Sequence, residues 1–207
     1  MNEDVKDYIE SMKQTLSFFI FSIVLFSSCR QTAQKAPPLI DGQCTEYERL
    51  NAKTISLAHG VKLHIYQDQH YVWLCYCYRE GSFGILDMKL ETSQLDGPLN
   101  LHVSAQLGEW PLNKPELQPE NSTSEKWWNH NGWTANAVWL NGLNRTEENT
   151  SPNWRNPLAR EIQLSKDRFG RGEWKVKMNI GSIMTAEGAL EGIVFPEGDK
   201  PYLLQVN

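Results

Sequence analysis

Tryptophans are concentrated in the polar, loop-like parts of this chain. Trp127 and Trp128 stand side by side and are followed directly by Asn129. Indole faces can stack on the C–H side of a sugar ring and planar amides can bond its hydroxyls, and a large indole is costly to leave in water without a partner. The sequence therefore predicts a carbohydrate site at Trp110, Trp127, Trp128, Asn129, Trp133 and Trp154.

The competing interpretation is that the loops fold back and bury these rings as an extension of the core. Trp73 and Trp174 already lie at core positions of expected strands. Tryptophan therefore also serves for packing here, and only the position of each loop ring in the folded chain separates the two interpretations.

Sequence signatures of the common enzyme classes are absent. The chain has no Gly-x-Ser-x-Gly elbow, no phosphate-binding loop, no His-Glu-x-x-His and no dinucleotide fingerprint. Its carboxylates are scattered, and the separation of a glycosidase pair is a property of the fold. We expect a protein that is not an enzyme, with a glycan-degrading hydrolase or lyase as the catalytic alternative.

The charge balance argues against one class of partner. The net charge is −5, and lysine and arginine form no cluster along the chain. Nucleic-acid binding needs a concentrated basic surface against the phosphates. No nucleic-acid partner is therefore expected.

The N-terminus carries a targeting signal. An apolar run over residues 16–26, too short for a comfortable membrane span, ends in two serines and Cys29. This pattern resembles a bacterial lipoprotein signal in which Cys29 is lipidated, so residues 1–29 are expected to be a signal peptide. Because residues 1–11 are acidic and Met12 precedes a lysine, we expect translation to start at Met12. The alternative is a helix packed in the core.

Three further cysteines, Cys44, Cys75 and Cys77, leave the disulfide pairing open. Exported proteins can form disulfides, and an odd number leaves at least one thiol free or paired outside the chain. Cys75 and Cys77 share a strand face, where a bond between them would be strained. Pairing of Cys44 with either one remains open, as do three buried thiols. Cys-x-Cys alone is weak as a metal motif.

The elements that must position the tryptophans are short strands. Residues 30–38 are polar with a proline pair, which predicts a flexible tether before a domain at 39–207. Alternating apolar residues predict strands, with a short helix at 46–51 and long loops at 108–132 and 141–157. Residues 181–192 are expected to form a loop or one helical turn. The expected strands are residues 54–58, 61–67, 68–78, 83–91, 99–107, 133–140, 160–164, 173–180 and 202–206.

This spacing, with little helical periodicity, predicts an all-β fold: an antiparallel β-sandwich of jelly-roll type. In the expected strand 68–78, residues 71–78 are apolar on both faces, as in a central strand covered on both sides. Its second face, with Tyr71, Trp73, Cys75 and Cys77, must be covered by loops or by the segment bearing Cys44. If that face is open instead, its aromatics become the better site.

Several stretches resemble the family 9 carbohydrate-binding-module-like domains. Residues 39–47 resemble their "IDG…EW" start, residues 68–76 their "DDxxLYV" strand, and residues 160–164 their late "EVAIP" strand. Tyr47 and Gln69 replace family residues. The resemblance implies a β-sandwich that binds sugars, with structural calcium in some members and Asp41 and Asp68 as calcium ligands or turn residues. No other cofactor is expected.

Together these features favour a non-catalytic carbohydrate-binding lipoprotein of the bacterial cell envelope. Its expected partners are a carbohydrate and the bacterial membrane, held through the lipid on Cys29, with the domain facing the periplasm or the cell surface. The alternative from another class is a structural or assembly lipoprotein whose aromatic loops dock another envelope protein.

Overall fold

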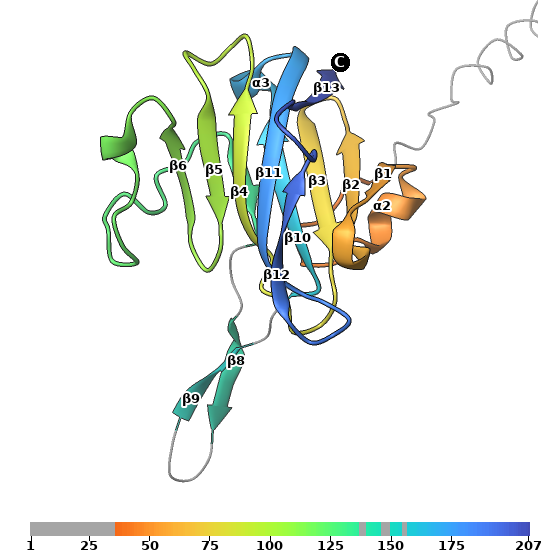
Figure 1. The fold of residues 1–207 in the computed structure, drawn as a ribbon, viewed down its shortest axis with the longest axis vertical. Helices are drawn as coiled ribbons and strands as arrows, with labels where there is room; N and C mark the ends of the chain where they lie inside the picture. Colours follow the sequence, from red (N-terminus) through yellow and green to blue (C-terminus); the bar gives the residue numbers. More distant parts are fainter. Residues whose placement is uncertain (1–35, 137–139, 146–149, 155–156) are drawn as a thin grey trace, which may run out of the picture. The chain divides into compact units, whose positions relative to one another are not determined.

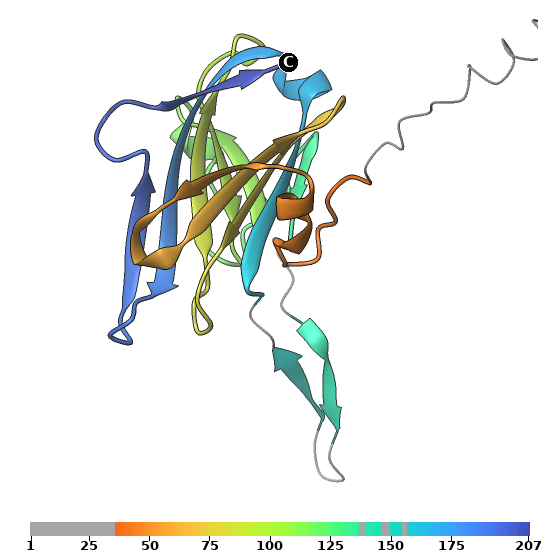
Figure 2. The same ribbon diagram turned by 90° about the vertical axis from the view of Figure 1, so that its right-hand side faces the viewer.

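Two antiparallel β-sheets pack face to face (Figures 1 and 2). The computed structural model describes residues 36–136, 140–145, 150–154 and 157–207, and residues 37–207 form one compact unit. The predicted signal peptide, with Cys29 and the start at Met12, lies outside the described residues, as does most of the tether. Within the described residues, no helix is long and apolar enough to span a membrane. The predicted antiparallel β-sandwich is confirmed.

The first sheet, called sheet A, has the predicted central strand in its middle. In spatial order its strands are β1 (Lys53–Ser56), β2 (Lys62–Gln67), β3 (Tyr71–Cys77), β10 (Ala159–Ser165) and β7 (Trp133–Ala135). The five inner residues of β3 are all buried. The expectation that this strand is covered on both sides is therefore confirmed.

The second sheet, sheet B, is built around the longest strand. Its order is β12 (Leu190–Phe195), β11 (Gly172–Met184), β4 (Ile85–Glu91), β5 (Leu99–Val103) and β6 (Leu107–Pro111). β13 (Tyr202–Val206) pairs with the first part of β11 and β12 with the second part. The remaining elements are α2 (Thr45–Arg49), η1 (Ala58–Gly60), η2 (Pro115–Leu117), α3 (Lys166–Phe169), β8 (Leu140–Arg145) and β9 (Thr150–Trp154).

The core lies between the sheets and follows the alternation of the strands. Leu74 of β3 and Ile162 of β10 are register partners that point inward from sheet A, and Met88 and Leu101 do so from sheet B. All four are almost completely buried. Burial of each such side chain contributes roughly 1.5–3 kcal/mol, so the alternating apolar positions decide which face of each strand is internal.

The predicted strand over residues 99–107 is wrong. The chain turns at Ser104, whose amide donates to the Gln106 carbonyl oxygen at 2.9 Å, and returns as β6 with Leu107 opposite Val103. A three-residue connection keeps the in–out phase of the alternation, so two strands look like one in the sequence. Consequently the predicted loop at 108–132 begins four residues later, and Trp110 lies on a strand.

Three other assignments are also wrong. Residues 141–157, expected as a loop, contain the β8–β9 hairpin. Residues 181–192 form the end of β11 and the start of β12, since a bulge between Ile180 and Ile183 carries the strand past Gly181. In the predicted strand 133–140, β7 ends at Ala135, and residues 137–139 lie outside the described residues.

Candidate functional site

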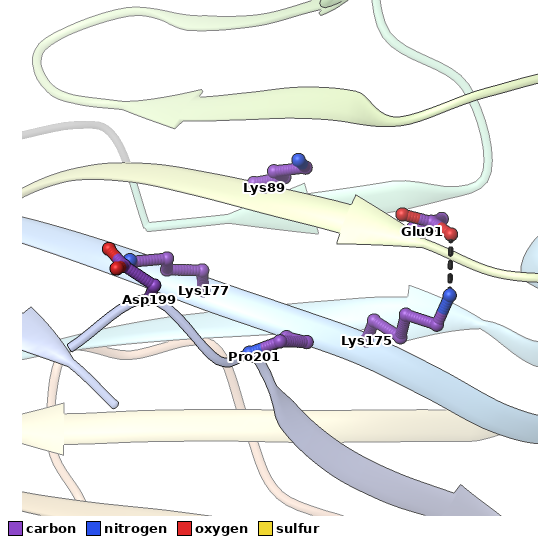
Figure 3. A pocket seen from close by; sticks show the side chains of 6 residues that line it. All are labelled: Lys89, Glu91, Lys175, Lys177, Asp199 and Pro201. Atoms are coloured by element: carbon purple, nitrogen blue, oxygen red, sulfur yellow. Dashed lines mark hydrogen bonds and ion pairs between the residues drawn. The ribbon is translucent and has the colours of Figure 1, made fainter. Parts of the chain in front are cut away.

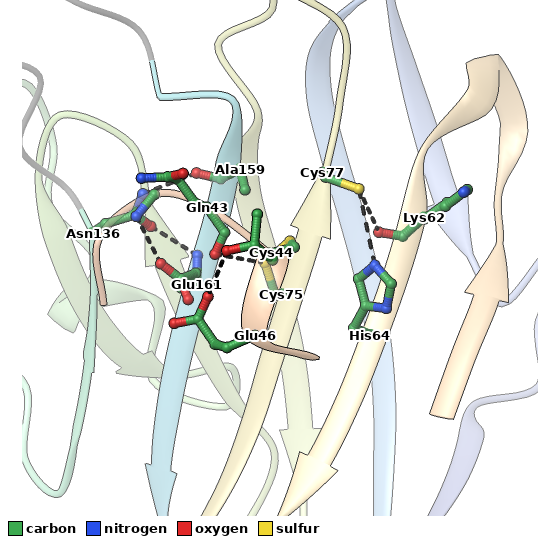
Figure 4. The surroundings of a disulfide bond; sticks show 12 residues. Gln43, Cys44, Glu46, Lys62, His64, Cys75, Cys77, Asn136, Ala159 and Glu161 are labelled. Carbon is green, nitrogen blue, oxygen red and sulfur yellow. Dashed lines mark hydrogen bonds between the residues drawn. A yellow bond between two sulfur atoms is a disulfide. The ribbon is translucent and has the colours of Figure 1, made fainter. Parts of the chain in front are cut away.

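The outer face of sheet A is closed by the N-terminal segment. Tyr47 of α2 packs on Trp73 and Cys75, and a disulfide joins Cys44 to Cys75 (Figure 4). The expectation that the segment bearing Cys44 covers this face is confirmed. Because Tyr47, Trp73 and Cys75 are buried, the rings beneath the segment are not open to a ligand, and of the β3 aromatics on this face only Tyr71 is partly exposed.

Trp133, predicted as a sugar ligand, is 5% exposed and packs in the core between the sheets. Its indole N–H donates to Glu109 Oε2 at 2.6 Å. Arg168 of α3 donates to both oxygens of the same carboxylate at 2.6 Å. Trp133 therefore links β7, an edge strand of sheet A, to β6, an edge strand of sheet B, through Glu109. Its burial leaves little indole surface for a sugar.

Arg168→Ala is expected to lower the free energy of unfolding by about 3 kcal/mol, because it leaves a mostly buried carboxylate without its bidentate partner. The two side chains are 21% and 13% exposed. Urea unfolding followed by tryptophan fluorescence measures the change. Arg168→Lys should lose less, since it keeps the charge without the fork geometry. A loss below about 1 kcal/mol in Arg168→Ala, typical of surface ion pairs, would contradict this role.

An aromatic cluster lies on the outer face of sheet B. The register places Trp110 beside Asn100 and Gly108 beside His102, on the face opposite the core. The Trp127 ring covers Gly108, where an added Cβ would lie 3.0 Å from its Cε3 atom. Ring centroids are 5.1 Å apart for His102 and Trp127 and 6.4 Å apart for Trp110 and Trp127. Gly108 is thus needed for close approach of the indole.

The indole of Trp127 is held in place but keeps part of its surface open. Its N–H donates to the Asn121 carbonyl oxygen at 2.7 Å, and the side chain is half-buried. Trp110 beneath it is 6% exposed. The predicted pair Trp110 and Trp127 is therefore brought together, with Trp127 as the accessible member.

A hydrogen-bonded polar group adjoins these rings. Asp87 Oδ1 accepts from His102 Nδ1 and from the Asn100 amide, both at 2.9 Å. Since a carboxylate only accepts, His102 carries its proton on Nδ1, and its Nε2 is an acceptor in the neutral ring. Burial opposes ionisation of Asp87, but the two hydrogen bonds outweigh it and lower the pKa of Asp87. The face therefore offers a charged carboxylate next to aromatic rings.

Further across the same face, the structure forms a hollow of about 350 Å³ (Figure 3). Lys175 Nζ lies 2.8 Å from Glu91 Oε1, and Lys177 Nζ donates to the Gly198 carbonyl oxygen at 2.6 Å. Lys89 is exposed. With Asp199, these side chains place three ammonium groups and two carboxylates on one exposed surface. The hollow is lined by Lys89, Glu91, Lys175, Lys177, Asp199 and Pro201.

Trp128 and Asn129 continue from Trp127 along the edge of β6. The Trp128 amide donates to the Leu107 carbonyl oxygen at 2.7 Å, and the Glu109 amide to the Asn129 carbonyl oxygen at 3.3 Å. Trp128 is 52% exposed, so it offers open indole surface next to the cluster. Trp154 lies on β9, and its side chain lies outside the described part of the structure.

The sequence prediction missed the polar half of this face. Asn100 and His102 alternate with the apolar residues of their strand, but neither is among the residues predicted for the carbohydrate site. The signal that could have found them is the cross-strand match with Asp87, which depends on pairing β4 with β5.

An acidic cluster lies beside the N-terminal segment (Figure 4). Carboxylate oxygens of Asp41, Glu46 and Glu161 lie within 4.8 Å of one another. Glu161 is fully buried, and its Oε2 accepts from the Asp41 and Gly42 amides at 2.7 Å. The buried Tyr47 hydroxyl interacts with the same carboxylate, but neither that hydroxyl nor Glu161 Oε1 has a hydrogen bond of regular geometry among the described residues. Three carboxylates gathered this closely, one of them buried, are a donor set that suits a hard cation such as calcium.

Asp41 and Asp68, the two predicted calcium ligands, lie at different places in the structure. Asp41 belongs to the acidic cluster, as an exposed residue. Asp68 instead closes the β2–β3 turn: its Oδ1 accepts from the His70 and Tyr71 amides and its Oδ2 from the Trp73 indole, all at 2.7 Å. Asp68 therefore does not fit a cation site, and the structure accounts for it as a turn residue.

Comparison with known proteins gives a distant structural likeness and no match in sequence. No family model and no curated protein matches the chain. The crystal structure of a proposed carbohydrate-binding protein from Bacteroides uniformis matches with a TM-score of 0.42 and 7% identity, over 82% of this chain and 89% of that chain. A likeness at this level says nothing about function, so any function assigned to the site rests on its geometry.

Proposed function

We propose that the outer face of sheet B binds a carbohydrate without cleaving it. The observation that carries this proposal is the Trp127 indole, held over Gly108 beside the Asp87–His102 pair. A pyranose stacked on Trp127 would place its hydroxyls toward donors and acceptors that are already oriented. Binding on prepared groups loses little entropy, which favours affinity for a weakly interacting ligand.

The hollow extends this site. Lys89, Lys175 and Lys177 can donate to hydroxyls of a glycan that extends from the aromatic cluster. The ammonium groups outnumber Glu91 and Asp199 in the hollow by one, so an acidic group on the glycan is also acceptable there. The ligand we expect is therefore an oligosaccharide, and the test includes both neutral and acidic glycans.

The spacing of Asp87 and Glu91 gives no glycosidase pair beside the aromatic cluster. Asp87 and Glu91 point to the same side of β4, four residues apart. At about 3.3 Å per residue their Cα atoms are roughly 13 Å apart, whereas a glycosidase pair needs about 5–9.5 Å between carboxyl groups. We therefore assign no catalytic residue, and Asp87 is proposed to accept sugar hydroxyls.

A structural calcium ion is part of the proposal. Asp41, Glu46 and Glu161 would hold it, and the buried Oε1 of Glu161 would become a ligand. The ion would link the segment after the tether to β10 of sheet A. Its contribution would be to stability, since the cluster and the sugar-binding face belong to different sheets.

The proposed location is the bacterial cell envelope, through lipid on Cys29. Cys29→Ser is expected to release the protein from the membrane fraction, because it removes the lipid attachment residue. Cell fractionation with immunoblotting measures the release. The mass of the mature wild-type protein should correspond to a chain that begins at Cys29. A mature protein that retains residues 1–11 would contradict both the cleavage and the start at Met12.

The function is tested by titrating purified protein with plant, algal and host oligosaccharides in a calorimeter. Saturable binding of at least one neutral or acidic glycan, without release of shorter products, is the expected result. If the folded protein binds no glycan but retains a defined envelope protein in a pull-down, the aromatic face is a docking surface instead. Product release from a polysaccharide would restore the hydrolase or lyase interpretation.

A further inference from the structure

Cys77 lies next to the disulfide on the outer face of sheet A (Figure 4). Cys75 and Cys77 point to the same side of β3, and Cys44 reaches Cys75 from the covering segment. The Sγ atoms of Cys44 and Cys77 lie within 4.8 Å of each other. The free thiol therefore lies close to a sulfur of an existing disulfide.

A histidine faces the same thiol. His64 Nε2 lies 4.0 Å from Cys77 Sγ, and His64 is the register partner of Cys75 across β2 and β3. The Cys77 thiol can also donate to the Lys62 carbonyl oxygen at 3.7 Å, but a carbonyl cannot take the proton away, so His64 is the base of the pair. The Thr54 hydroxyl donates to the Ala52 carbonyl oxygen at 3.5 Å, so its oxygen is free to accept from His64 Nδ1 at 2.9 Å. This arrangement leaves the lone pair of Nε2 directed to Cys77.

His64 is also kept neutral by its surroundings. Its side chain is 4% exposed, and burial lowers the pKa of His64. The charged groups that act on it are Glu48 of the segment after Cys44, which opposes this shift, and Lys62 of β2, which adds to it. A neutral imidazole at this position can accept the thiol proton.

We propose that the protein carries out thiol–disulfide exchange within this cluster, so that Cys44 alternates between Cys75 and Cys77 as its partner. Cys77 passes its proton to His64 Nε2, and its thiolate attacks Cys44 Sγ. The Cys44–Cys77 bond forms as the Cys44–Cys75 bond breaks, and Cys75 leaves as a thiolate that takes the proton from His64. One disulfide and one thiol are present before and after, so no oxidant or reductant is needed.

The exchange would change which thiol can be reached while the covering segment stays attached. Cys77 is partly exposed, whereas Cys75 is fully buried. The Cys44–Cys75 form therefore presents a thiol to reagents or to another cysteine, and the Cys44–Cys77 form hides it. Cys77 would thus alternate between a thiol that can be modified and a protected half of a disulfide, with the number of thiols and disulfides unchanged.

The test maps the disulfides of the full chain carrying Cys29→Ser, so that no other thiol takes part. Samples are held at pH 8, quenched and digested with pepsin near pH 2, where thiols stay protonated, and the linked peptides are sequenced by mass spectrometry. Both Cys44–Cys75 and Cys44–Cys77 peptides are expected. Treatment of the native protein with N-ethylmaleimide should deplete the Cys44–Cys77 peptide over time. The reagent alkylates Cys77 only in the Cys44–Cys75 form and so draws protein out of the other form.

His64→Gln tests the proton acceptor. In this variant, loss of the Cys44–Cys77 peptide during N-ethylmaleimide treatment should be slower by roughly tenfold or more. The ratio of the two disulfides before treatment should stay nearly unchanged, since a base alters the rate of proton transfer and not the equilibrium. A single Cys44–Cys75 linkage in the starting protein, or a Cys44–Cys77 linkage that the reagent does not deplete, would overturn the exchange. An undiminished rate in His64→Gln would remove His64 from it.

Discussion

Trp127→Ala is expected to weaken carbohydrate binding by roughly 30-fold or more, because truncating a central tryptophan commonly costs about 2 kcal/mol or more. The indole supplies the accessible ring of the cluster on sheet B, above Gly108 and His102. Calorimetric titration with the best glycan of the panel measures the loss. The melting temperature should change little, since the ring is half-buried on a surface loop.

Gly108→Val provides a sharper control for the same prediction. The valine suits a strand but places its Cβ 3.0 Å from the Trp127 ring, so the indole must move while remaining in the protein. Carbohydrate binding by Gly108→Val should therefore be weakened, as it is expected to be in Trp127→Ala. Trp128→Ala measures the contribution of the exposed neighbouring ring, which we expect to be smaller. A folded Trp127→Ala protein that binds like wild type would remove the aromatic cluster from the proposed site.

Calcium is expected to raise the melting temperature of the wild-type protein by roughly 5–10 °C. An ion at 100 times its dissociation constant adds about 2.7 kcal/mol, and each kcal/mol shifts the melting of a domain of this size by about 2–4 °C. Differential scanning calorimetry with and without a chelator measures the shift. Glu161→Gln should remove it, because the amide can still accept from the Asp41 and Gly42 amides but carries no charge.

The pH dependence gives a second measurement on the same cluster. Burial raises the pKa of Glu161 from 4.5 to about 7; the Gly42 and Asp41 amides partly offset this, and the charges of Asp41 and Glu46 add to it. Without a cation, the folded state therefore binds this proton more tightly than the unfolded state. The free energy of unfolding should fall as the pH rises from about 4.5 to about 7, by up to about 3 kcal/mol.

Calcium should reverse that loss, since the ion needs the deprotonated carboxylates. Its stabilising effect is expected to grow between pH 5 and 8, as the proton that competes for Glu161 is removed. In Glu161→Gln both the calcium effect and this part of the pH dependence should disappear together. Wild-type protein with the same melting temperature in calcium and in chelator at pH 8 would contradict the cation site.

The sequence by itself determined the sandwich and the location of its centre. Residues 71–78 are apolar on both faces of an extended chain, and a strand with that pattern is stable only if both of its faces are covered. The same reasoning required a cover for the second face and offered loops or the segment with Cys44 for it; the tertiary structure decided for the segment. Alternation is a local property, so these assignments needed no knowledge of which strands pair.

Only the tertiary structure decided which tryptophans form a surface. Trp133 and Trp127 stand in the same polar stretch, yet one packs between the sheets and the other lies on an outer face. The surface beneath Trp127 could not be predicted because the turn at residues 104–106 has an odd length. It therefore preserves the alternation and conceals β6. The pairing of β6 with β5 then places Trp110 and Gly108 beneath Trp127, next to Asp87. Such cross-strand neighbours are distant in sequence, and the physical reason they meet is burial of the opposite faces of their strands.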